Sequence, residues 1–380
     1  MIILNIKKKK YNPISNQDEK MLLTSFNIKK NNKTYKIIII FILLFIIYYI
    51  LYNFFLINKS RLYNKNIKFD EFPLFNNKTE LFNILKNEED VNLYLKNKTQ
   101  YYYKKRKSYL DKGGWKYDES NLVIFQEKVN YLMIHESPEY KSILSDKIRI
   151  HEYSKKILGK DICVPILKVY DNVDEINLDE LPDKFVLKCN HGSDMNIFCK
   201  DKSKFNLDEA KKSLNRWVNN NYAFVNGEIQ YLFIKRKILS APYLGDNIFD
   251  YKFFCFHGEP KYVVANKVLD KDMHTKLYNF YDLNWTLTDF ELGVPGYLRK
   301  PELQIEKPKN FDLMIDYAKK LSNEFAFVRV DLYEINNTVF LSELTFSPSN
   351  LNMHFKNQQQ CKFLGSLIDI TKIRPYLFNK

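Results

Sequence analysis

The sequence predicts an α+β fold, because stretches with the 3.6-residue period of helices alternate with β-rich runs that are joined by short turns. The β-rich runs include residues 184–189 and two hairpin patterns at 250–265 and 326–344. Helical patterns include residues 148–158 and 207–220. The chain has 380 residues, of which 45% are hydrophobic, and this is enough to bury the core of one large domain or two modest ones.

An apolar segment lies in the sequence before the residues that we assign to this fold. Residues 37–57, IIIIFILLFIIYYILYNFFLI, contain no charged side chain, and at ~1.5 Å per residue a helix of this length crosses the hydrocarbon layer of a bilayer. We interpret the segment as a single transmembrane helix, because a buried helix of a soluble protein usually keeps a polar stripe. A cleaved signal peptide is disfavoured, since no small-residue cleavage site follows the segment.

The basic tail, residues 1–36, favours a cytoplasmic N-terminus, because lysine dominates it and its acids are Asp18 and Glu19. Within twenty residues of the apolar segment the bias is small, with five basic residues before it and four after it. The expectation is a type II membrane protein of the secretory pathway, in the ER, the Golgi or at the cell surface. Glycosylation sequons that fit a lumenal body stand at Asn58, Asn77, Asn97, Asn284 and Asn336.

Residues 58–127 are polar and rich in lysine, asparagine and tyrosine, which is typical of a stem or spacer. From residue 128 to residue 380 the helical and strand patterns are separated by clear turn signals, and we assign the folded domain to this range. Its last helical pattern, at 311–325, opens after Asn310 as an expected N-cap. It leads into the final hairpin pattern, whose turn is expected near Asn336 and Asn337.

Composition argues against two classes of protein. The formal net charge is +14, but 51 of the 59 basic residues are lysine and asparagine is abundant throughout, so the charge reflects a biased composition. No zinc-ligand spacing or RNA-binding module accompanies it, and we expect no nucleic-acid partner. The five cysteines include no C-x-x-C pair, which argues against a metal knuckle or a disulfide framework.

One candidate site follows the strand at 184–189. Alternation places Lys188 on one face of that strand, directly before Asn190, His191, Gly192 and Ser193. Glycine allows close backbone approach, and the amides of such a turn can hold phosphate oxygens. A lysine point charge beside the turn suits a triphosphate. The alternative is a solvated lysine ahead of an ordinary turn.

The second candidate site is VRVDLYEINNTVFLSELTF. Arg329 and Asp331 share a strand face, and Glu343 stands twelve residues after the aspartate. Because that separation is even, an odd-length loop would bring Asp331 and Glu343 to the same face, where their oxygens could hold Mg²⁺. A two-residue loop would place them on opposite faces. The alternative is a salt bridge between Arg329 and an acid.

Four blocks in this order resemble the TupA-like ATP-grasp family, named for teichuronopeptide biosynthesis. The blocks are LPDKFVLKCNHGS, DYKFFCFHGEPKYV, DMHTKLYNFYDLNW and FVRVDLYEINNTVFLSELTFSPSN, and SDKIRIHEYSKKILG lies upstream, so that the similarity covers about residues 128 to 370. The resemblance implies an ATP-grasp fold, in which two α+β lobes hold ATP with Mg²⁺ between them. It also implies that a carboxylate is phosphorylated and an amine then attacks the acylphosphate.

The resemblance assigns roles by position. Lys188 would contact the ATP phosphates, and His191, Gly192 and Ser193 would belong to the phosphate-covering loop. Lys252 would be a second phosphate or substrate contact. Asp331 and Glu343 match the metal-binding acids, and Arg329 would stabilise the charge on the transferred phosphoryl group. This inventory suffices for phosphoryl transfer, which asks a protein mainly for positioning and charge neutralisation.

The chain departs from the family pattern at three places. Asp194 replaces the last glycine of His-Gly-Ser-Gly, and a carboxylate there opposes phosphate binding by about 1 kcal/mol at ~4 Å in water. Ala241 and Pro242 occupy the usual acidic hinge position, and Thr345 replaces the metal-binding asparagine.

These observations predict a membrane-anchored protein with ATP- and Mg²⁺-dependent carboxylate–amine ligase chemistry in cell-surface polysaccharide or glycoconjugate biosynthesis. Its partners would be a nucleotide and a carboxylate or sugar-linked acceptor. One alternative is a type II glycosyltransferase, in which Asp270-Lys271-Asp272 would hold Mn²⁺ against a nucleotide-sugar. The other alternative is an anchored binding protein that keeps the fold without the chemistry.

Overall fold

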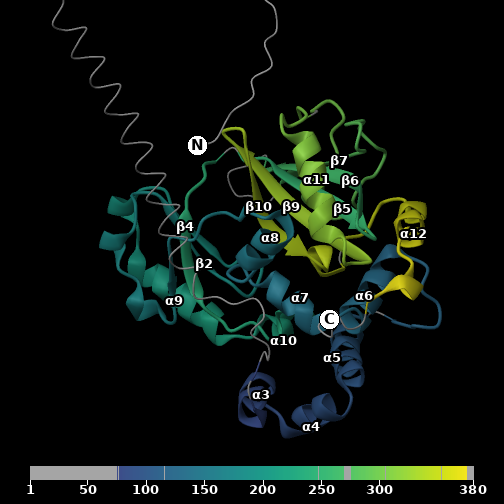
Figure 1. Ribbon diagram of the computed structural model, residues 1–380, viewed down its shortest axis with the longest axis horizontal. Helices are drawn as coiled ribbons and strands as arrows, with labels where there is room; N and C mark the ends of the chain where they lie inside the picture. The colour runs from purple at the N-terminus through teal and green to yellow at the C-terminus, as the bar shows by residue number, and fades with distance from the viewer. Residues whose placement is uncertain are drawn as a thin grey trace, which may run out of the picture. The chain divides into compact units, whose positions relative to one another are not determined.

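The computed structural model describes residues 75, 77–114, 116–246, 248–268, 275–303, 305–351 and 353–374 (Figure 1). All of these residues belong to one compact unit, Leu56–Lys380. The predicted tail at 1–36, the predicted membrane segment at 37–57 and the Asp270-Lys271-Asp272 motif lie outside the described residues. No helix within the described residues combines the length and the apolar character that crossing a bilayer requires.

Two β-sheets form the framework. The larger sheet has six strands in the order β10-β9-β5-β6-β7-β8, and the smaller sheet has four in the order β1-β4-β2-β3. Neighbouring strands are antiparallel except for the parallel pair β7 and β8. The strands are β1 Lys168–Tyr170, β2 Phe185–Cys189, β3 Asn196–Cys199, β4 Ile238–Pro242, β5 Asp250–Phe256, β6 Glu259–Val268, β7 Lys276–Tyr281, β8 Tyr297–Leu298, β9 Phe327–Ile335 and β10 Thr338–Thr345.

Helices surround the two sheets, as the mixed α+β prediction requires. They are α3 Lys78–Leu85, α4 Glu88–Lys96, α5 Lys98–Lys112, α6 Phe125–His135, α7 Pro138–Ser145, α8 Ile150–Leu158, α9 Leu207–Asn219, α10 Tyr222–Asn226, α11 Phe311–Ser322 and α12 Gln358–Ser366. Asn310 precedes α11 as expected, but its side chain does not cap the helix. It donates instead to Glu334 and to the carbonyl of Asn337, and so ties the start of α11 to the β9–β10 hairpin.

Side-chain alternation gives the large sheet two different faces. One face, with Phe253, Val330 and Leu332 in its centre, packs in a continuous core against α7, α8 and α11. In Figure 1, α11 lies along this sheet, where it contacts β9, β5 and β6. The opposite face is apolar at one end, where Phe254 and Phe327 pack against α6 and α12. The remainder of that face is polar and forms the candidate site.

The smaller sheet divides in the same way, and the predicted alternation of β2 is confirmed. Phe185, Leu187 and Cys189 are fully buried in a core that includes Leu214 of α9. Lys188 lies on the other face, as does Val186, which is paired with Ala241 of β4. That face is the second wall of the site.

The described part of the predicted spacer is helical. Its helices α3, α4 and α5 each begin at an asparagine whose side chain accepts a backbone N–H bond, and these caps are Asn77, Asn87 and Asn97. Their buried face combines aliphatic residues with the three tyrosines Tyr94, Tyr101 and Tyr102, and it shares one core cluster with Ile134 and Phe233 of the following domain. Because tyrosine carries both an apolar ring and a polar tip, a hydrophobic count along this segment underestimates the periodicity.

Candidate functional site

A β-bulge brings the two predicted metal acids to one face of the sheet. The β9–β10 hairpin turns through Asn336 and Asn337, both with positive φ, so its loop has two residues. Such a loop alone would place Asp331 and Glu343 on opposite faces. Ser342 is an extra residue that shifts the register, and Glu343 consequently lies directly opposite Asp331. The expected same-face arrangement is therefore present, and the bulge rather than the loop length produces it.

Five charged side chains form a cluster on this face, which we call the charged cluster: Asp250, Lys252, Arg329, Asp331 and Glu343. Asp331 is 1% exposed and accepts bonds from Arg329 Nε to Oδ1 at 2.7 Å and from Arg329 Nη2 to Oδ2 at 2.6 Å. Lys252 Nζ donates to the same Oδ2 at 2.9 Å and is also bonded to Asp250. Arg329 Nη2 lies 3.5 Å from Glu343 Oε1, so one guanidinium contacts both predicted metal acids.

Within the charged cluster, the neighbouring charges favour the ionised forms of Asp331 and Lys252, whereas burial raises the pKa of the Asp250 carboxyl. Burial opposes the charge on Asp331, but Arg329 and Lys252 outweigh it and hold the pKa of that carboxyl below its usual range. Burial likewise opposes the charge on Lys252, and the carboxylates of Asp250 and Asp331 raise its pKa well above the ordinary value. The alternative of a salt bridge between Arg329 and an acid is thus present in the structure. It coexists with the pairing of Asp331 and Glu343 and does not replace it.

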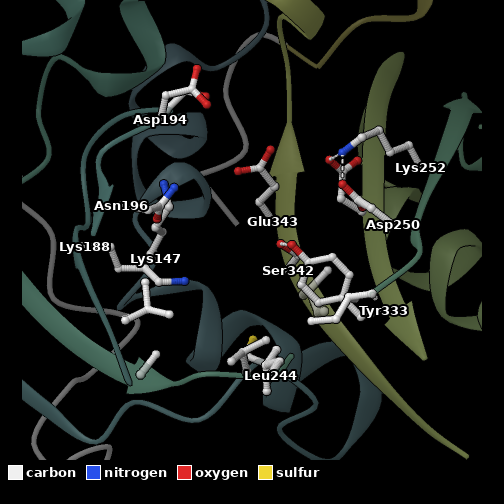
Figure 2. Close-up of a pocket in the computed structure, with 18 of the residues that line it drawn as sticks. Lys147, Lys188, Asp194, Asn196, Leu244, Asp250, Lys252, Tyr333, Ser342 and Glu343 are labelled. Carbon is white, nitrogen blue, oxygen red and sulfur yellow. Dashed lines mark hydrogen bonds and ion pairs between the residues drawn. The ribbon is translucent and has the colours of Figure 1, made fainter. Parts of the chain in front are cut away.

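The opposite wall carries the predicted phosphate lysine. Lys188 is half-buried on β2, and its ammonium makes no hydrogen bond or ion pair with any described residue. Burial and the nearby charge of Lys147 lower its pKa to about 8, and Glu343 of the facing sheet opposes that shift. Figure 2 shows Lys147 and Lys188 on one side of the cavity and Glu343 on the other.

The loop after β2 begins with two buried polar residues, Asn190 and His191, and its next three residues, Gly192, Ser193 and Asp194, line the cavity. A Cβ on Gly192 would lie 2.8 Å from a Tyr222 ring carbon, which explains the glycine. His191 is fully buried, and its Nε2 lies 3.1 Å from the carbonyl of Trp217. Burial lowers its pKa to about 4, so the neutral ring donates from Nε2 and anchors the loop from below.

The two walls enclose a cavity of about 590 Å³, whose lining includes residues of both sheets. Of the predicted site residues, Lys188, Gly192, Ser193, Lys252, Arg329, Asp331 and Glu343 line it and His191 does not. A separate group of lining residues is apolar and includes Val164, Ile166, Val186, Leu239, Ala241 and Leu244. The cavity therefore combines an apolar surface that suits a planar ring with cations that suit phosphates.

Lys147 is a site residue that the sequence prediction did not include. Its Nζ donates to the carbonyl of Gly192 at 2.5 Å and so holds the phosphate loop from the cavity side. The residue before Lys147, Asp146, accepts a hydrogen bond from Asn190 Nδ2 at 2.9 Å. Two adjacent residues therefore contact the loop, one at Asn190 and one at Gly192. The adjacent Asp-Lys pair in SDKIRIHEY is the sequence signal that would have identified it.

The residues present fit Mg²⁺ at the paired acids. Carboxylate oxygens are the ligands that Mg²⁺ prefers, and the Glu343 side chain is 35% exposed with an Oε2 that makes no hydrogen bond to a described residue. Asp331 Oδ1 accepts a single bond, so it also keeps a free lone pair. The hydroxyl of Thr345 donates to Glu343 Oε1 at 2.9 Å, and it therefore orients the glutamate.

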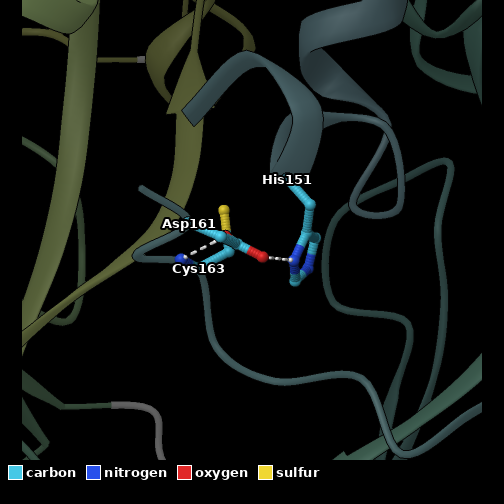
Figure 3. Close-up of side chains that lie close together, drawn as sticks. All are labelled: His151, Asp161 and Cys163. Atoms are coloured by element: carbon cyan, nitrogen blue, oxygen red, sulfur yellow. Dashed lines mark hydrogen bonds and ion pairs between the residues drawn. The ribbon is translucent and has the colours of Figure 1, made fainter. Parts of the chain in front are cut away.

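A further group of metal-ligating residue types borders the cavity (Figure 3). His151, Asp161 and Cys163 present ligand atoms that all lie within 4.8 Å of one another. Asp161 accepts from His151 Nδ1 at 2.8 Å and from the backbone N–H of Cys163 at 3.0 Å. These hydrogen bonds account for the arrangement without a metal, because they fix the turn at Asp161 and the orientation of the imidazole. We assign no metal site here.

Two sheets that bring a lysine and a phosphate loop against paired acidic residues define the ATP-grasp class of fold. The chain belongs to the TupA-like ATP-grasp family, since the family model described as TupA-like ATPgrasp matches residues 127–369. The predicted resemblance is confirmed. The match leaves the glycosyltransferase alternative without support, and no curated protein sequence matches the chain.

Several solved structures are similar at low identity. D-alanine–D-alanine ligase from Helicobacter pylori is 16% identical with a TM-score of 0.34, and the match covers 60% of this chain and 61% of that one. The Bacillus anthracis D-alanine–D-alanine ligase complexed with ATP is 14% identical with a TM-score of 0.37, covering 69% and 81%. The biotin carboxylase complex with β-γ-ATP from Campylobacter jejuni is 12% identical with a TM-score of 0.37, covering 65% and 51%.

The two metal acids should differ in what they do for folding. Asp331→Asn removes the anion that compensates two buried cations, so we expect it to lower the free energy of unfolding by about 3–5 kcal/mol. Glu343→Gln changes a half-exposed carboxylate and should cost less than about 1 kcal/mol. Urea unfolding of the full chain measures both variants. Equal losses would contradict the assignment of Asp331 as the structural centre of the cluster.

Proposed function

We propose that this protein is an ATP- and Mg²⁺-dependent ligase that joins a carboxylate to an amine. The observation that carries the proposal is that Lys188 of one sheet and the Asp331–Glu343 pair of the other open onto the same cavity. Membership of the TupA-like ATP-grasp family supports the nucleotide as a substrate. The carboxylate and amine substrates belong to this proposal.

The nucleotide would lie between the two sheets. The apolar residues, which include Val186 and Leu239, offer a surface for the base, and Lys147, Lys188 and the loop at Gly192 surround the position of the phosphates. Asp331 and Glu343 would hold Mg²⁺, which supplies positive charge to the phosphate oxygens when bound. Lys147 and Lys188 lie across the cavity from Glu343 in Figure 2, so the phosphates would be neutralised from two sides.

The reaction would proceed in two transfers. A substrate carboxylate oxygen attacks the γ-phosphorus of ATP, the bond between that phosphorus and the β-γ bridging oxygen breaks, and ADP leaves. The amine lone pair then attacks the acyl carbon, inorganic phosphate leaves, and the nitrogen releases a proton to water. Arg329 and Lys252 contribute fixed positive charge where the phosphoryl group passes. Because both are already paired in the cluster, their positions are set before substrate arrives.

Nucleotide affinity should depend on pH through Lys188. Because its pKa is about 8, the Lys188 amine carries a positive charge below pH 8 and loses that charge as the pH rises above 8. We therefore expect the Kd for Mg-AMP-PNP to be constant from pH 6.5 to 7.5 and about tenfold weaker at pH 9.5. Lys188→Arg should keep tight binding across this range, and Lys188→Met should bind weakly throughout. Isothermal titration calorimetry measures each Kd, and no nucleotide binding at millimolar concentration would refute the enzymatic proposal.

We also propose that residues 37–57 anchor the protein in a membrane and that it acts in cell-surface polysaccharide or glycoconjugate biosynthesis. The uncharged 21-residue segment supports the anchor. Topology matters for the chemistry, because a type II orientation would place the site away from cytosolic ATP. Protease protection of intact vesicles measures it: the proposed orientation predicts a body that survives added protease until detergent is present. Cleavage in intact vesicles would instead put the site on the cytosolic side.

The non-catalytic alternative has one observation in its favour. Asp194 lines the cavity with an exposed carboxylate and has φ of 58°, a conformation that favours glycine. Asp194→Gly removes the charge and the strain, and we expect it to tighten Mg-AMP-PNP binding about fivefold, by roughly 1 kcal/mol. Asp194→Asn tests the charge alone and should give most of that gain. Weaker binding in both variants would instead assign Asp194 a constructive role in this site.

A further inference from the structure

The cations of the cavity differ in what neutralises them. Five basic side chains line it. Lys252 and Arg329 are bound to acids of the charged cluster, and Lys147 donates to the Gly192 carbonyl. Lys188 and Lys276 make no ion pair or hydrogen bond through their ammonium groups with any described residue. The proposed nucleotide site uses Lys188, and Lys276 is left without a role.

Lys276 stands far from the nucleotide end. It is the first residue of β7, on the same sheet face as Tyr278, which is paired across the strands with Asn266. The strand order places β7 four inter-strand spacings from β10, which carries Glu343. At ~4.8 Å per spacing the two strands are about 19 Å apart across the sheet, and Lys276 is also four residues along β7 from Phe280, the position level with Glu343. One triphosphate held by Lys188 and Glu343 therefore does not account for Lys276.

The surroundings of Lys276 suit a ligand rather than a protein acid. Its Nζ lies 5.8 Å from the ring centre of Tyr297, and that ring packs edge-on against Tyr278 at 5.1 Å. Tyr297, Tyr278 and Asn266 all line the cavity with it. Asp250 lies on the same face two strands away, but Lys252 already binds its carboxylate. The half-buried ammonium thus faces aromatic rings and open cavity.

We propose that Lys276 binds a second anionic group of the substrate whose carboxylate is activated. The inference rests on the proposed function, because it takes the charged cluster as the place where the reactive carboxylate is phosphorylated. The substrate would then carry two anionic groups, a carboxylate that reacts at the cluster and a carboxylate or phosphate that Lys276 holds several ångströms away. A charge-assisted contact of this kind both positions the substrate and selects against compounds with a single anion.

The test compares acids with one and two anionic ends on the full chain in detergent. The probes are the α,ω-dicarboxylates from succinate to suberate, the monocarboxylates of equal length, and ω-phosphonocarboxylates of the same series. Each is titrated calorimetrically in the presence of saturating Mg-AMP-PNP. At the best chain length we expect a doubly anionic probe to bind about tenfold more tightly than its monocarboxylate. A preference for the phosphonate over the dicarboxylate would identify the second group as phosphate-like.

Lys276→Met should reduce this ratio to about one and leave the Kd of Mg-AMP-PNP unchanged. The matched control is Lys267→Met, because Lys267 is half-buried on the neighbouring strand with its Nζ 5.3 Å from the Phe249 ring, but on the opposite sheet face. This control should keep the full ratio. A ratio of one in the unmodified protein, or a ratio that survives Lys276→Met, overturns the proposal.

Two further outcomes separate the possible failures. If Mg-AMP-PNP does not bind, the proposed function fails, and the same titrations without nucleotide still decide whether Lys276 selects doubly anionic probes. Asp270 and Asp272 lie outside the described residues, and their effect on Lys276 is tested directly by substitution. If the ratio appears only in an Asp270→Asn, Asp272→Asn double variant, Lys276 is paired with these acids and the inference is wrong.

Discussion

The ion pairs that Arg329 and Lys252 make with the buried carboxylate of Asp331 are the interaction on which the site depends. Taking a carboxylate out of water costs several kcal/mol unless cations and hydrogen bonds compensate it, and here two cations do so at 2.6–2.9 Å. Because Lys252 lies on β5 and Asp331 directly opposite it on β9, their ion pair also supports the register of these two neighbouring strands. Arg329 then reaches Glu343 and Thr345 on β10, so one charge pattern connects three strands.

That compensation divides the basic residues of the cavity into two kinds. Lys252 and Arg329 form ion pairs with a protein carboxylate, and these pairs hold both side chains in fixed positions on the cavity wall. Lys188 and Lys276 have no acidic partner among the described residues, so their charge is available to a ligand. For Lys188, partial burial without a partner also lowers the cost of losing the proton, and its pKa of about 8 reflects this. Whether a lysine is paired is therefore more informative here than whether it lines the cavity.

Sequence reasoning predicted the mixed fold, the faces of β2 and the position of the final hairpin, because alternation and turn residues are local signals. The convergence of Asp331 and Glu343 was predicted only conditionally, since loop parity leaves two outcomes. The deciding feature, the bulge at Ser342, depends on how the strands pair and has no marker such as glycine at that position. His191 was assigned to the phosphate loop, but its burial beneath α9 depends on contacts with Trp217 that are 26 residues away.

Lys276 was overlooked in the sequence for a related reason. It stands in a run of aromatic and basic residues, where one more lysine carries no signal in a chain with 51 of them. What distinguishes Lys276 is its position in the fold. It lies on the face of the sheet that lines the cavity, but on β7, four strands from β10 and away from the acids that neutralise the other cations. A cation that is half-buried and unpaired loses hydration without gaining a counter-ion, and a bound anion removes that cost. The same physical argument that makes Asp331 a structural carboxylate thus makes Lys276 a binding residue.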